Sequence, residues 1–395
     1  MFKFKLMTNL RVGVDGVKEL GNLIKELGYH KPGLIIDRGV TTHAQTKKAL
    51  ESLNAAGLEH QIFENTAVEP DYDYLDFFRK NFMDKGFDCL VGIGGGSALD
   101  LTKGVATLVA NQGPAISYRG FPKLENRPVP VIAIPTTAGT GSEVTYNAVF
   151  TDSHEKRKLG INSEYNHPVL SIIDPLFTVD CPKSVTVSSG CDALVHALES
   201  YLHIRHTPLS RMYSIEAFRL LYNNLMKVLD DPENIEIRTN IALGAYLAGI
   251  ALINAGPGPT GAFSYPLGAV YKVPHGYAGA VFLSSIMRLN VLKGYEDYAQ
   301  LYDLIEKSDR NLSIRQKNIQ FAQKIQELMD KLDVPRSLKA FGLKEKDIEF
   351  MIGQYDALKP TIALNPIEVT QEDIRQMMTD LGNGELPFVR EAVTR

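Results

Sequence analysis

Residues Cys89–Lys103 read CLVGIGGGSALDLTK, and this stretch decides the fold. A short apolar run leads into the glycines Gly94–Gly96, and a helical pattern follows directly, with Ser97 and Asp100 as a predicted capping box. A strand that turns through glycines into a helix is typical of a parallel sheet covered by helices. The glycines let the backbone approach a pyrophosphate, and the helix N-terminus supplies N–H groups and a positive dipole. The alternative interpretation is a tight turn that binds nothing.

Further apolar runs extend this pattern along the first half of the chain, at residues 33–37, 60–65, 131–137 and 169–175. Helical patterns separate these runs, which predicts a Rossmann-like α/β domain with a parallel sheet. Beyond about Pro182 the strand signals stop, and helical segments follow one another. We therefore expect an NAD(P)-binding α/β domain over residues 1–180 and an all-α domain over residues 181–395.

A second loop of interest reads PTTAGTGSEVT, from Pro135 to Thr145, and leaves a predicted strand. Its small and hydroxyl residues suit a nucleotide lying across it, although a plain polar loop is the alternative. The carboxyl ends of parallel strands meet at one edge of a sheet, so both loops are expected in the crevice where open α/β sheets bind ligands. Asp37, at the end of another strand, could accept hydrogen bonds from an adenosine ribose or simply face solvent.

A candidate metal site begins with Asp192 and His196, within GCDALVHALE. The two residues are four apart in a helical pattern, so they share one helix face. A carboxylate and an imidazole in this arrangement can bind a divalent cation. His275, in the predicted loop VPHG, is a third candidate ligand. The alternative is an ordinary polar pair on the surface or in the core.

Composition excludes several other classes of function. The formal charge is 42 − 46 = −4, and the chain has no block of like charge, which argues against a nucleic-acid partner. Three cysteines without a C-x-x-C pair cannot build a disulfide framework. The first residues lack the long apolar core of a secretory signal, so we expect a cytoplasmic protein.

One charge-free stretch could be mistaken for a membrane span. It runs from Thr239 to Tyr271, and its best apolar run, Ile241–Ile253, is too short for a bilayer, which needs about 20 residues. A helix buried on all sides is the better interpretation, and no membrane partner is expected.

Together these segments closely resemble the iron-containing (group III) alcohol dehydrogenase family. The resemblance rests on GGGSALDLTK from Gly94, IPTTAGTGSEVT from Ile134, GCDALVHALESY from Gly190 and YPLGAVYKVPHG from Tyr265. It implies an N-terminal dinucleotide-binding domain, a C-terminal helical domain and an active site between them. It further implies a homodimer that acts on a small alcohol or aldehyde.

The resemblance also assigns roles to individual residues. It implies that the metal ligands, for iron or zinc, include Asp192, His196 and His275. It places Asp37 where an acidic residue favours NAD over NADP. The residues implied to bind the cofactor are Asp37, Gly94, Gly95, Gly96, Ser97, Asp100, Thr136, Thr137, Asn147 and Lys158.

The chain departs from the family pattern at two positions. The family usually has histidine-x-x-x-histidine before Pro-Leu-Gly, the first a metal ligand and the second beside the nicotinamide. Here Gly261 and Tyr265 stand at these positions. Three protein ligands are enough for many catalytic metals, so we expect a more open metal site. We also expect the Tyr265 hydroxyl to donate the proton that the histidine would handle.

The sequence therefore supports an NAD-dependent and metal-dependent alcohol dehydrogenase or aldehyde reductase. A non-catalytic or metal-free NAD-binding homologue is one alternative, and an enzyme like dehydroquinate synthase, without net redox chemistry, is another. A basic cluster after the Asp192–His196 helix allows an acidic substrate, although neutralisation of a helix C-terminus is the favoured interpretation. This cluster consists of His203, Arg205, His206 and Arg211.

Overall fold

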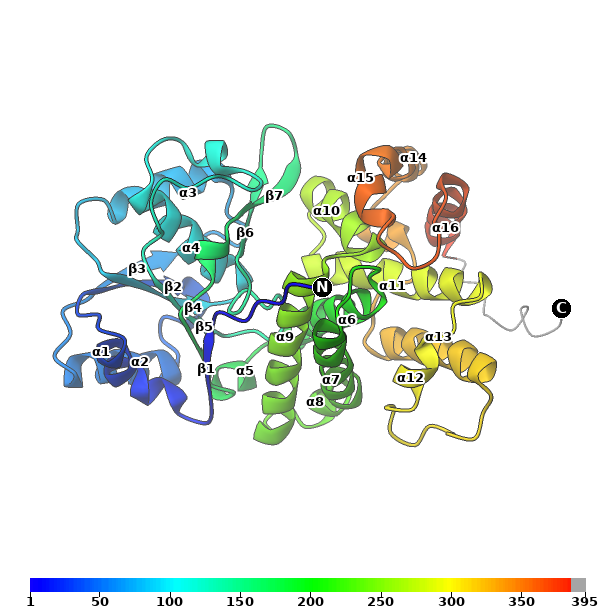
Figure 1. The fold of residues 1–395 in the computed structure, drawn as a ribbon, viewed down its shortest axis with the longest axis horizontal. Helices are drawn as coiled ribbons and strands as arrows, with labels where there is room; N and C mark the ends of the chain where they lie inside the picture. The colour runs from blue at the N-terminus through cyan, green and yellow to red at the C-terminus, as the bar shows by residue number, and fades with distance from the viewer. Residues whose placement is uncertain (385–395) are drawn as a thin grey trace. The chain divides into compact units, whose positions relative to one another are not determined.

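The computed structural model describes residues 1–384, and the chain divides into two compact units. The sheet unit comprises Lys5–Thr186 and Pro232–Ala242, and the helical unit comprises Met1–Phe4, Val187–Asp231 and the described residues from Leu243 onward. Each unit has its own hydrophobic core. Figure 1 labels the helices and strands of both units.

The sheet unit is built on six parallel strands in the order β1-β8-β5-β4-β2-β3. The strands are β1 (Asn9–Val12), β2 (Pro32–Asp37), β3 (Gln61–Asn65), β4 (Cys89–Gly94), β5 (Val131–Pro135) and β8 (Leu170–Ile173). This parallel sheet confirms the predicted α/β fold class. Strand β4 lies between β2 and β5, so the loops that follow these three strands leave the sheet side by side.

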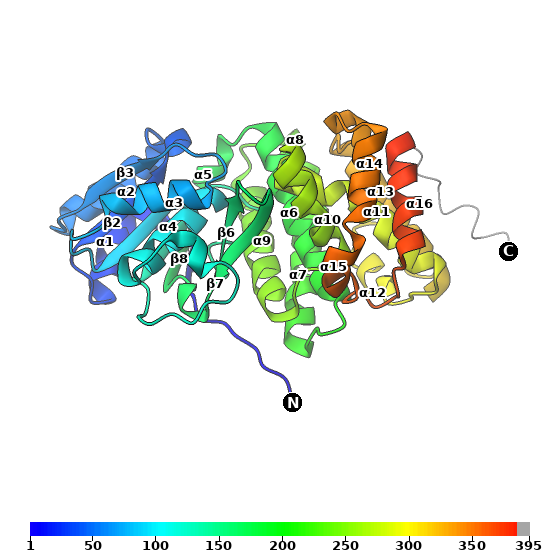
Figure 2. The ribbon, with the colours of Figure 1, turned by 90° about the horizontal axis from the view of Figure 1, so that it is seen from above.

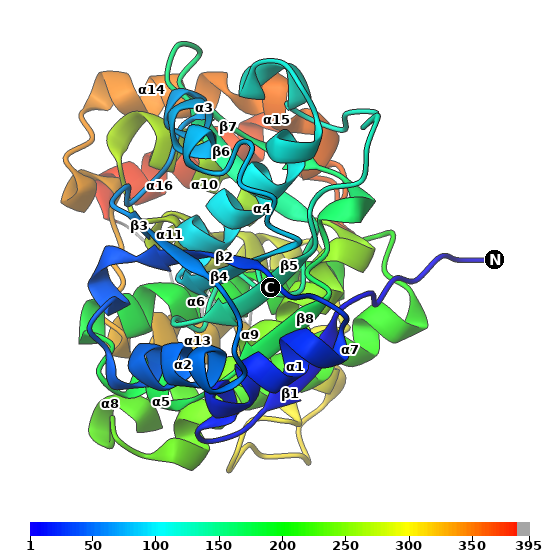
Figure 3. The ribbon, with the colours of Figure 1, turned by 90° about the vertical axis from the view of Figure 1, so that its left-hand side faces the viewer.

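Both faces of the sheet are covered by helices. The covering helices are α1 (Leu20–Glu26), α2 (Ala44–Ala55), α3 (Tyr72–Phe78) and α4 (Gly96–Ala110). Side chains alternate along β2, so Leu34 and Ile36 pack with α1 and α2, whereas Ile35 packs with α3 and α4. Figure 3 shows these two pairs of helices on opposite sides of the strands. The near-continuous apolar runs in the sequence reflect this burial on both faces.

Two strands of a separate hairpin were not expected from the sequence. Strands β6 (Asn147–Asp152) and β7 (Arg157–Asn162) pair antiparallel and form a two-stranded sheet of their own. Their sequences, NAVFTD and RKLGIN, mix polar and apolar residues and lack a long apolar run. Edge strand β1 was also missed, because its four residues, NLRV, are largely exposed and too few for a clear apolar run.

The remaining long helices lie in the helical unit, except that the first residues of α6 and α9 belong to the sheet unit. The helices from residue 183 onward are α6 (Lys183–Leu202), α7 (Pro208–Leu225), α8 (Lys227–Asp230), α9 (Ile235–Ala255), α10 (Pro259–Tyr271), α11 (His275–Leu292), α12 (Tyr298–Tyr302), α13 (Ile314–Lys331), α14 (Glu345–Gly353), α15 (Tyr355–Ile362) and α16 (Gln371–Asn383). A short helix, α5 (Leu176–Val179), precedes them in the sheet unit. Figure 2 shows α14 and α16 side by side, and both pack with α10 and α11 in one core.

Helix α9 contains the start of the charge-free stretch. Among the described residues it is the one helix whose length and composition would allow it to cross a membrane, and 56% of that window is buried inside the protein. The helix is 21 residues long, so the prediction from its apolar run that it is too short for a bilayer is wrong, and just over half of the window is buried where the sequence predicted burial on all sides.

Candidate functional site

The glycine loop, Gly94–Ser97, connects the end of β4 to the start of α4. Gly95 is the N-cap of α4, and its carbonyl oxygen accepts the N–H groups of Ala98 and Leu99, each at 3.1 Å. No side chain caps the helix. The predicted capping box of Ser97 and Asp100 is therefore wrong. The helix begins on glycine backbone, which leaves its N-terminal N–H groups accessible to an anion.

Asp37 lies against the glycine loop. A Cβ atom added to Gly94 would lie 2.8 Å from the Cβ of Asp37 and 2.6 Å from that of Ala98. Burial raises the pKa of Asp37, and the N–H groups of Gly95, Arg38 and Gly39 oppose this shift by hydrogen bonding. Glycine at position 94 thus makes room for the carboxylate beside the turn.

The threonine loop, residues 136–146, follows β5 and lies directly against the glycine loop. The Thr136 N–H donates to the carbonyl of Gly94 at 3.0 Å. A Cβ atom at Gly95 would be 3.4 Å from Thr137 Oγ1, and one at Gly96 would be 2.6 Å from Thr140 Cγ2. The two loops singled out in the sequence are therefore neighbours at the carboxyl edge of the sheet. Together they offer backbone N–H groups and hydroxyls with little bulk.

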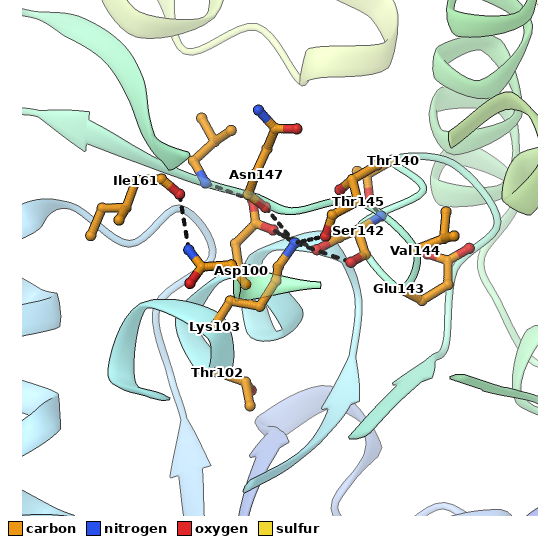
Figure 4. Close-up of polar contacts among 12 residues, drawn as sticks. Asp100, Thr102, Lys103, Thr140, Ser142, Glu143, Val144, Thr145, Asn147 and Ile161 are labelled. Carbon is orange, nitrogen blue, oxygen red and sulfur yellow. Dashed lines mark hydrogen bonds and ion pairs between the residues drawn. The ribbon is translucent and has the colours of Figure 1, made fainter. Parts of the chain in front are cut away.

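The carboxylate of Asp100 accepts hydrogen bonds from other groups of the protein (Figure 4). Its Oδ1 accepts the Ser142 hydroxyl at 2.5 Å, and its Oδ2 accepts the Val149 N–H at 2.9 Å. The Lys103 ammonium lies 2.9 Å from Oδ1. The structure thus places Asp100 as a support between α4, the threonine loop and β6, with its oxygens already occupied.

Asn147 and Lys158 lie on the β6–β7 hairpin, and both have partners within the sheet unit. The Asn147 side-chain amide donates to Asn162 Oδ1 at 2.8 Å. Lys158 Nζ lies 2.9 Å from Glu69 Oε1, and the lysine side chain is only 10% exposed. The hairpin therefore fixes both side chains.

Several buried charged residues were not singled out in the sequence analysis, and two of them lie behind the threonine loop. Lys103 is buried and contacts the loop, and Glu143 is buried within the loop itself. Burial raises the pKa of Glu143 to about 7, with its own N–H and nearby Lys103 opposing the shift. The only sign in the sequence that Lys103 and Glu143 are buried was a charged residue within a segment of apolar or small residues.

The metal-ligand candidates converge in the helical unit. Asp192 and His196 lie one turn apart on α6, and His275 is the first residue of α11. One ligand atom from each lies within 4.8 Å of the others. Asp192 Oδ1 is 3.6 Å from His196 Nε2 and 3.7 Å from His275 Nε2. One carboxylate and two imidazoles that converge in this way fit a divalent metal ion.

Close packing of α11 on α6 brings His275 to this cluster. A Cβ atom at Gly276 would lie 1.7 Å from the carbonyl oxygen of Ser188. No other residue type fits there without movement of the backbone, so the glycine after His275 sets how closely the two helices approach.

Glu199 is another buried charge that the sequence analysis did not single out. It lies on α6, one turn beyond His196, and is only 4% exposed. Its Oε2 accepts the N–H groups of Gly258 at 2.9 Å and Gly261 at 3.0 Å, and its Oε1 accepts that of Thr260 at 2.5 Å. Glu199 therefore caps the N-terminus of α10. The sequence could have identified Glu199 by its spacing from Asp192 and His196, which places the three residues on one helix face.

Gly261 and Tyr265 both lie on α10. A Cβ atom at Gly261 would be 3.0 Å from Glu199 Oε2. The Tyr265 ring lies 5.6 Å from that of His275, centroid to centroid, at an interplanar angle of 38°. The tyrosine is thus beside the metal-ligand cluster.

The basic residues that follow α6 do not converge on one site in the structure. Arg211 donates to the Tyr201 hydroxyl at 2.7 Å and pairs with Asp297 at 2.9 Å. His203 is buried, whereas Arg205 is exposed. Arg211 and His203 therefore serve the packing of the helical unit.

Comparison with known proteins covers almost the whole chain. The family model "Iron-containing alcohol dehydrogenase" matches residues 8–175, and the model for the C-terminal part of the same family matches residues 186–381. The NAD-dependent methanol dehydrogenase of Bacillus methanolicus is 32% identical over 93% of this chain and 96% of its own length. The sulfoacetaldehyde reductase of Bilophila wadsworthia is 30% identical over 93% of this chain and 95% of its own. The crystal structure of a 1,3-propanediol oxidoreductase superposes with a TM-score of 0.91, at 31% identity, over 96% of this chain and 100% of that one.

Proposed function

The chain belongs to the iron-containing alcohol dehydrogenase family and is an oxidoreductase that acts on CH–OH groups, and we propose that it interconverts a small polar alcohol and its aldehyde with NAD. Hydride would pass between the substrate carbon and the nicotinamide. The observation that carries the proposal is the convergence of Asp192, His196 and His275. The paired loops at the edge of the sheet support it independently.

The proposed metal ligands are Asp192, His196 and His275. A divalent metal bound there, iron or zinc, would polarise the substrate oxygen as a Lewis acid. Gly261 contributes no ligand atom, so the coordination sphere keeps more open positions than four protein ligands would leave. This openness suits a substrate larger than ethanol that offers a second oxygen.

We propose that Tyr265 handles the substrate proton. Its ring lies beside His275, and its phenol is a proton donor at the position of the missing histidine. Its ordinary pKa is about 10, and a nearby cation would lower this value toward the working range. Tyr265 would donate the proton in aldehyde reduction and accept it in alcohol oxidation.

For the cofactor site, we propose some residues that contact NAD directly and others that support them. Gly94, Gly95, Gly96 and Ser97 would approach the pyrophosphate, with the α4 dipole assisting. Thr136 and Thr137 would border the nucleotide. Asp37 would accept ribose hydroxyls and repel the 2′-phosphate of NADP. Asn147 and Lys158 would line the site from the hairpin, and Asp100 would support the loops.

We further propose a cytoplasmic homodimer. The support for a dimer comes only from the resemblance to the family. Cys89, Cys181 and Cys191 are free thiols, which suits a reducing compartment.

The first experiment is metal analysis by mass spectrometry on untagged protein, together with NAD(H)-linked turnover on a panel of alcohols and aldehydes. We expect about one metal ion per chain, lost in Asp192→Ala and retained in the control Glu216→Ala, which alters an exposed ion pair on α7. Absence of metal after anaerobic reconstitution would contradict the metal-dependent mechanism. It would favour the metal-free homologue that Gly261 and Tyr265 suggest.

A further inference from the structure

Lys103 carries a charge into the interior of the sheet unit. Its side chain is 0% exposed. Removing an ammonium group from water is costly unless protein atoms replace the lost hydration. The atoms around this ammonium group therefore indicate what the charge does.

Four oxygen atoms surround Lys103 Nζ (Figure 4). It donates to the backbone carbonyls of Ser142 at 3.0 Å and Thr145 at 3.3 Å, and also to that of Asn147. The fourth oxygen is Asp100 Oδ1, at 2.9 Å. Three of the four oxygens thus come from the backbone of the threonine loop and the first residue of β6.

The backbone of the loop is folded so that these carbonyls converge. The N–H groups of Val144 and Thr145 both donate to the Gly141 carbonyl, which closes a tight turn. Carbonyl dipoles that point at one location repel one another unless a cation lies among them. Rings of backbone carbonyls bind K⁺ in the same way, by replacing its hydration shell.

The ammonium group also connects the two loops of the cofactor site. Lys103 and Asp100 belong to α4, which begins at the glycine loop, whereas two of the three carbonyls belong to the threonine loop and the third to the first residue of β6. Within the same threonine loop, Thr137 and Thr140 lie against Gly95 and Gly96. The position of the carbonyl turn therefore affects the surface that both loops offer to a ligand.

We propose that Lys103 acts as a tethered monovalent cation, which holds the threonine loop on α4 and sets the geometry of the NAD site without touching NAD. Lys103 is a positioning residue in this proposal. The proposal rests on the proposed NAD binding for one of its two readouts, and the other readout needs no nucleotide.

The test compares Lys103→Met, which replaces the ammonium group with an apolar chain, and Lys103→Ala, which leaves space for a free cation. The matched control is Lys18→Met. Lys18 also pairs with an aspartate three residues away, at 2.6 Å, but its side chain is 55% exposed. Each variant is measured in choline chloride and in ammonium chloride at equal ionic strength.

The first readout is amide hydrogen exchange of residues 139–149 without nucleotide. We expect faster exchange in Lys103→Met and Lys103→Ala, and recovery by ammonium in Lys103→Ala alone. The second readout is the Kd for NADH from nicotinamide fluorescence. We expect it to rise at least about tenfold in both variants, and to fall at least about threefold when ammonium is added to Lys103→Ala. Lys18→Met should match the parent in both readouts.

The outcomes separate the two proposals. If the parent protein does not bind NADH, the proposed function fails, while hydrogen exchange still decides the role of Lys103. Unchanged exchange in Lys103→Met, or equal recovery in choline and ammonium, would overturn the tethered-cation proposal. If neither variant folds with ammonium present, Lys103 serves the fold of the whole unit, and the proposal is again overturned.

Discussion

At the scale of the residue, position 261 is one of the two positions where the sequence analysis expects a departure from the family pattern. A glycine there leaves the Asp192, His196 and His275 cluster without a fourth protein ligand from α10. The φ angle of Gly261 is not in the left-handed region, and a Cβ atom added there would lie 3.0 Å from Glu199 Oε2 and 3.4 Å from Pro257 Cβ.

We predict that Gly261→His increases metal retention. Adding an imidazole supplies a further ligand, so the rate of metal loss to a chelator should fall by roughly tenfold, which corresponds to about 1.4 kcal/mol. Gly261→Ala is the control, because it adds the Cβ atom near Glu199 without adding a ligand. Equal metal loss from both variants and the parent would show that position 261 does not face the metal.

Asp37 is the second residue whose role can be isolated. Its carboxylate lies beside Gly94, where an adenosine ribose would approach. We predict that Asp37→Asn, which removes the charge and keeps the shape, lowers the ratio of kcat/KM for NAD to that for NADP by about tenfold. Steady-state kinetics with both cofactors provides an internal control. A ratio equal to that of the parent would remove Asp37 from the cofactor site.

At the scale of the element, α10 depends on a carboxylate from α6. Three N–H groups at the start of α10 point at Glu199, so one side chain satisfies most of the donors that a helix N-terminus leaves open. This contact also fixes α10, with Gly261 and Tyr265, relative to the helix that carries Asp192 and His196.

We predict that Glu199→Gln destabilises the helical unit. A glutamine amide presents an N–H₂ group to backbone donors, which leaves at least one buried donor unsatisfied at a cost of about 1–3 kcal/mol. Denaturant unfolding measures this cost. The control Glu296→Gln alters a glutamate in the helical unit that is exposed. An unfolding free energy equal to that of the parent would mean that the α10 N-terminus finds other partners.

At the scale of the whole molecule, buried neutral histidines link stability to pH in both units. Burial lowers the pKa of His167 in the sheet unit and of His203 in the helical unit to about 4. His167 Nδ1 donates to the Val144 carbonyl at 3.0 Å, and His203 Nδ1 accepts the Arg205 N–H at 3.0 Å. A second proton on either ring would be buried without a suitable partner.

We predict that both units lose stability as the pH falls. An unfolded histidine has a pKa of about 6.5, so between about pH 6.5 and pH 4 the unfolded chain binds more protons than the folded one. The stability that the neutral histidines contribute is complete above pH 6.5 and declines through this window. The variant His167→Gln with His203→Gln should show a smaller decline in unfolding free energy. An equal decline would assign acid sensitivity to other groups.

The sequence by itself determined the features that depend only on residues close to one another along the chain. Buried strands show as apolar runs, the glycine loop follows its strand directly, and Asp192 and His196 share a face because they are four residues apart. These features follow from local geometry, which repeats with a fixed period. The division of roles between residues 1–180 and 181–395 stays a prediction.

The tertiary structure alone decided which groups from distant segments meet. The sequence could not show that the Asp100 carboxylate is occupied by Ser142 and Val149, or that Glu199 caps α10. The β6–β7 hairpin also needed the structure, because its mixed polar strands carry no strong periodic signal. The approach of His275 to α6 depends on the packing of two helices at Gly276. Packing determines which distant groups meet, together with the need of each buried polar group for a hydrogen-bond partner. Neither can be inferred from the spacing of residues along the chain.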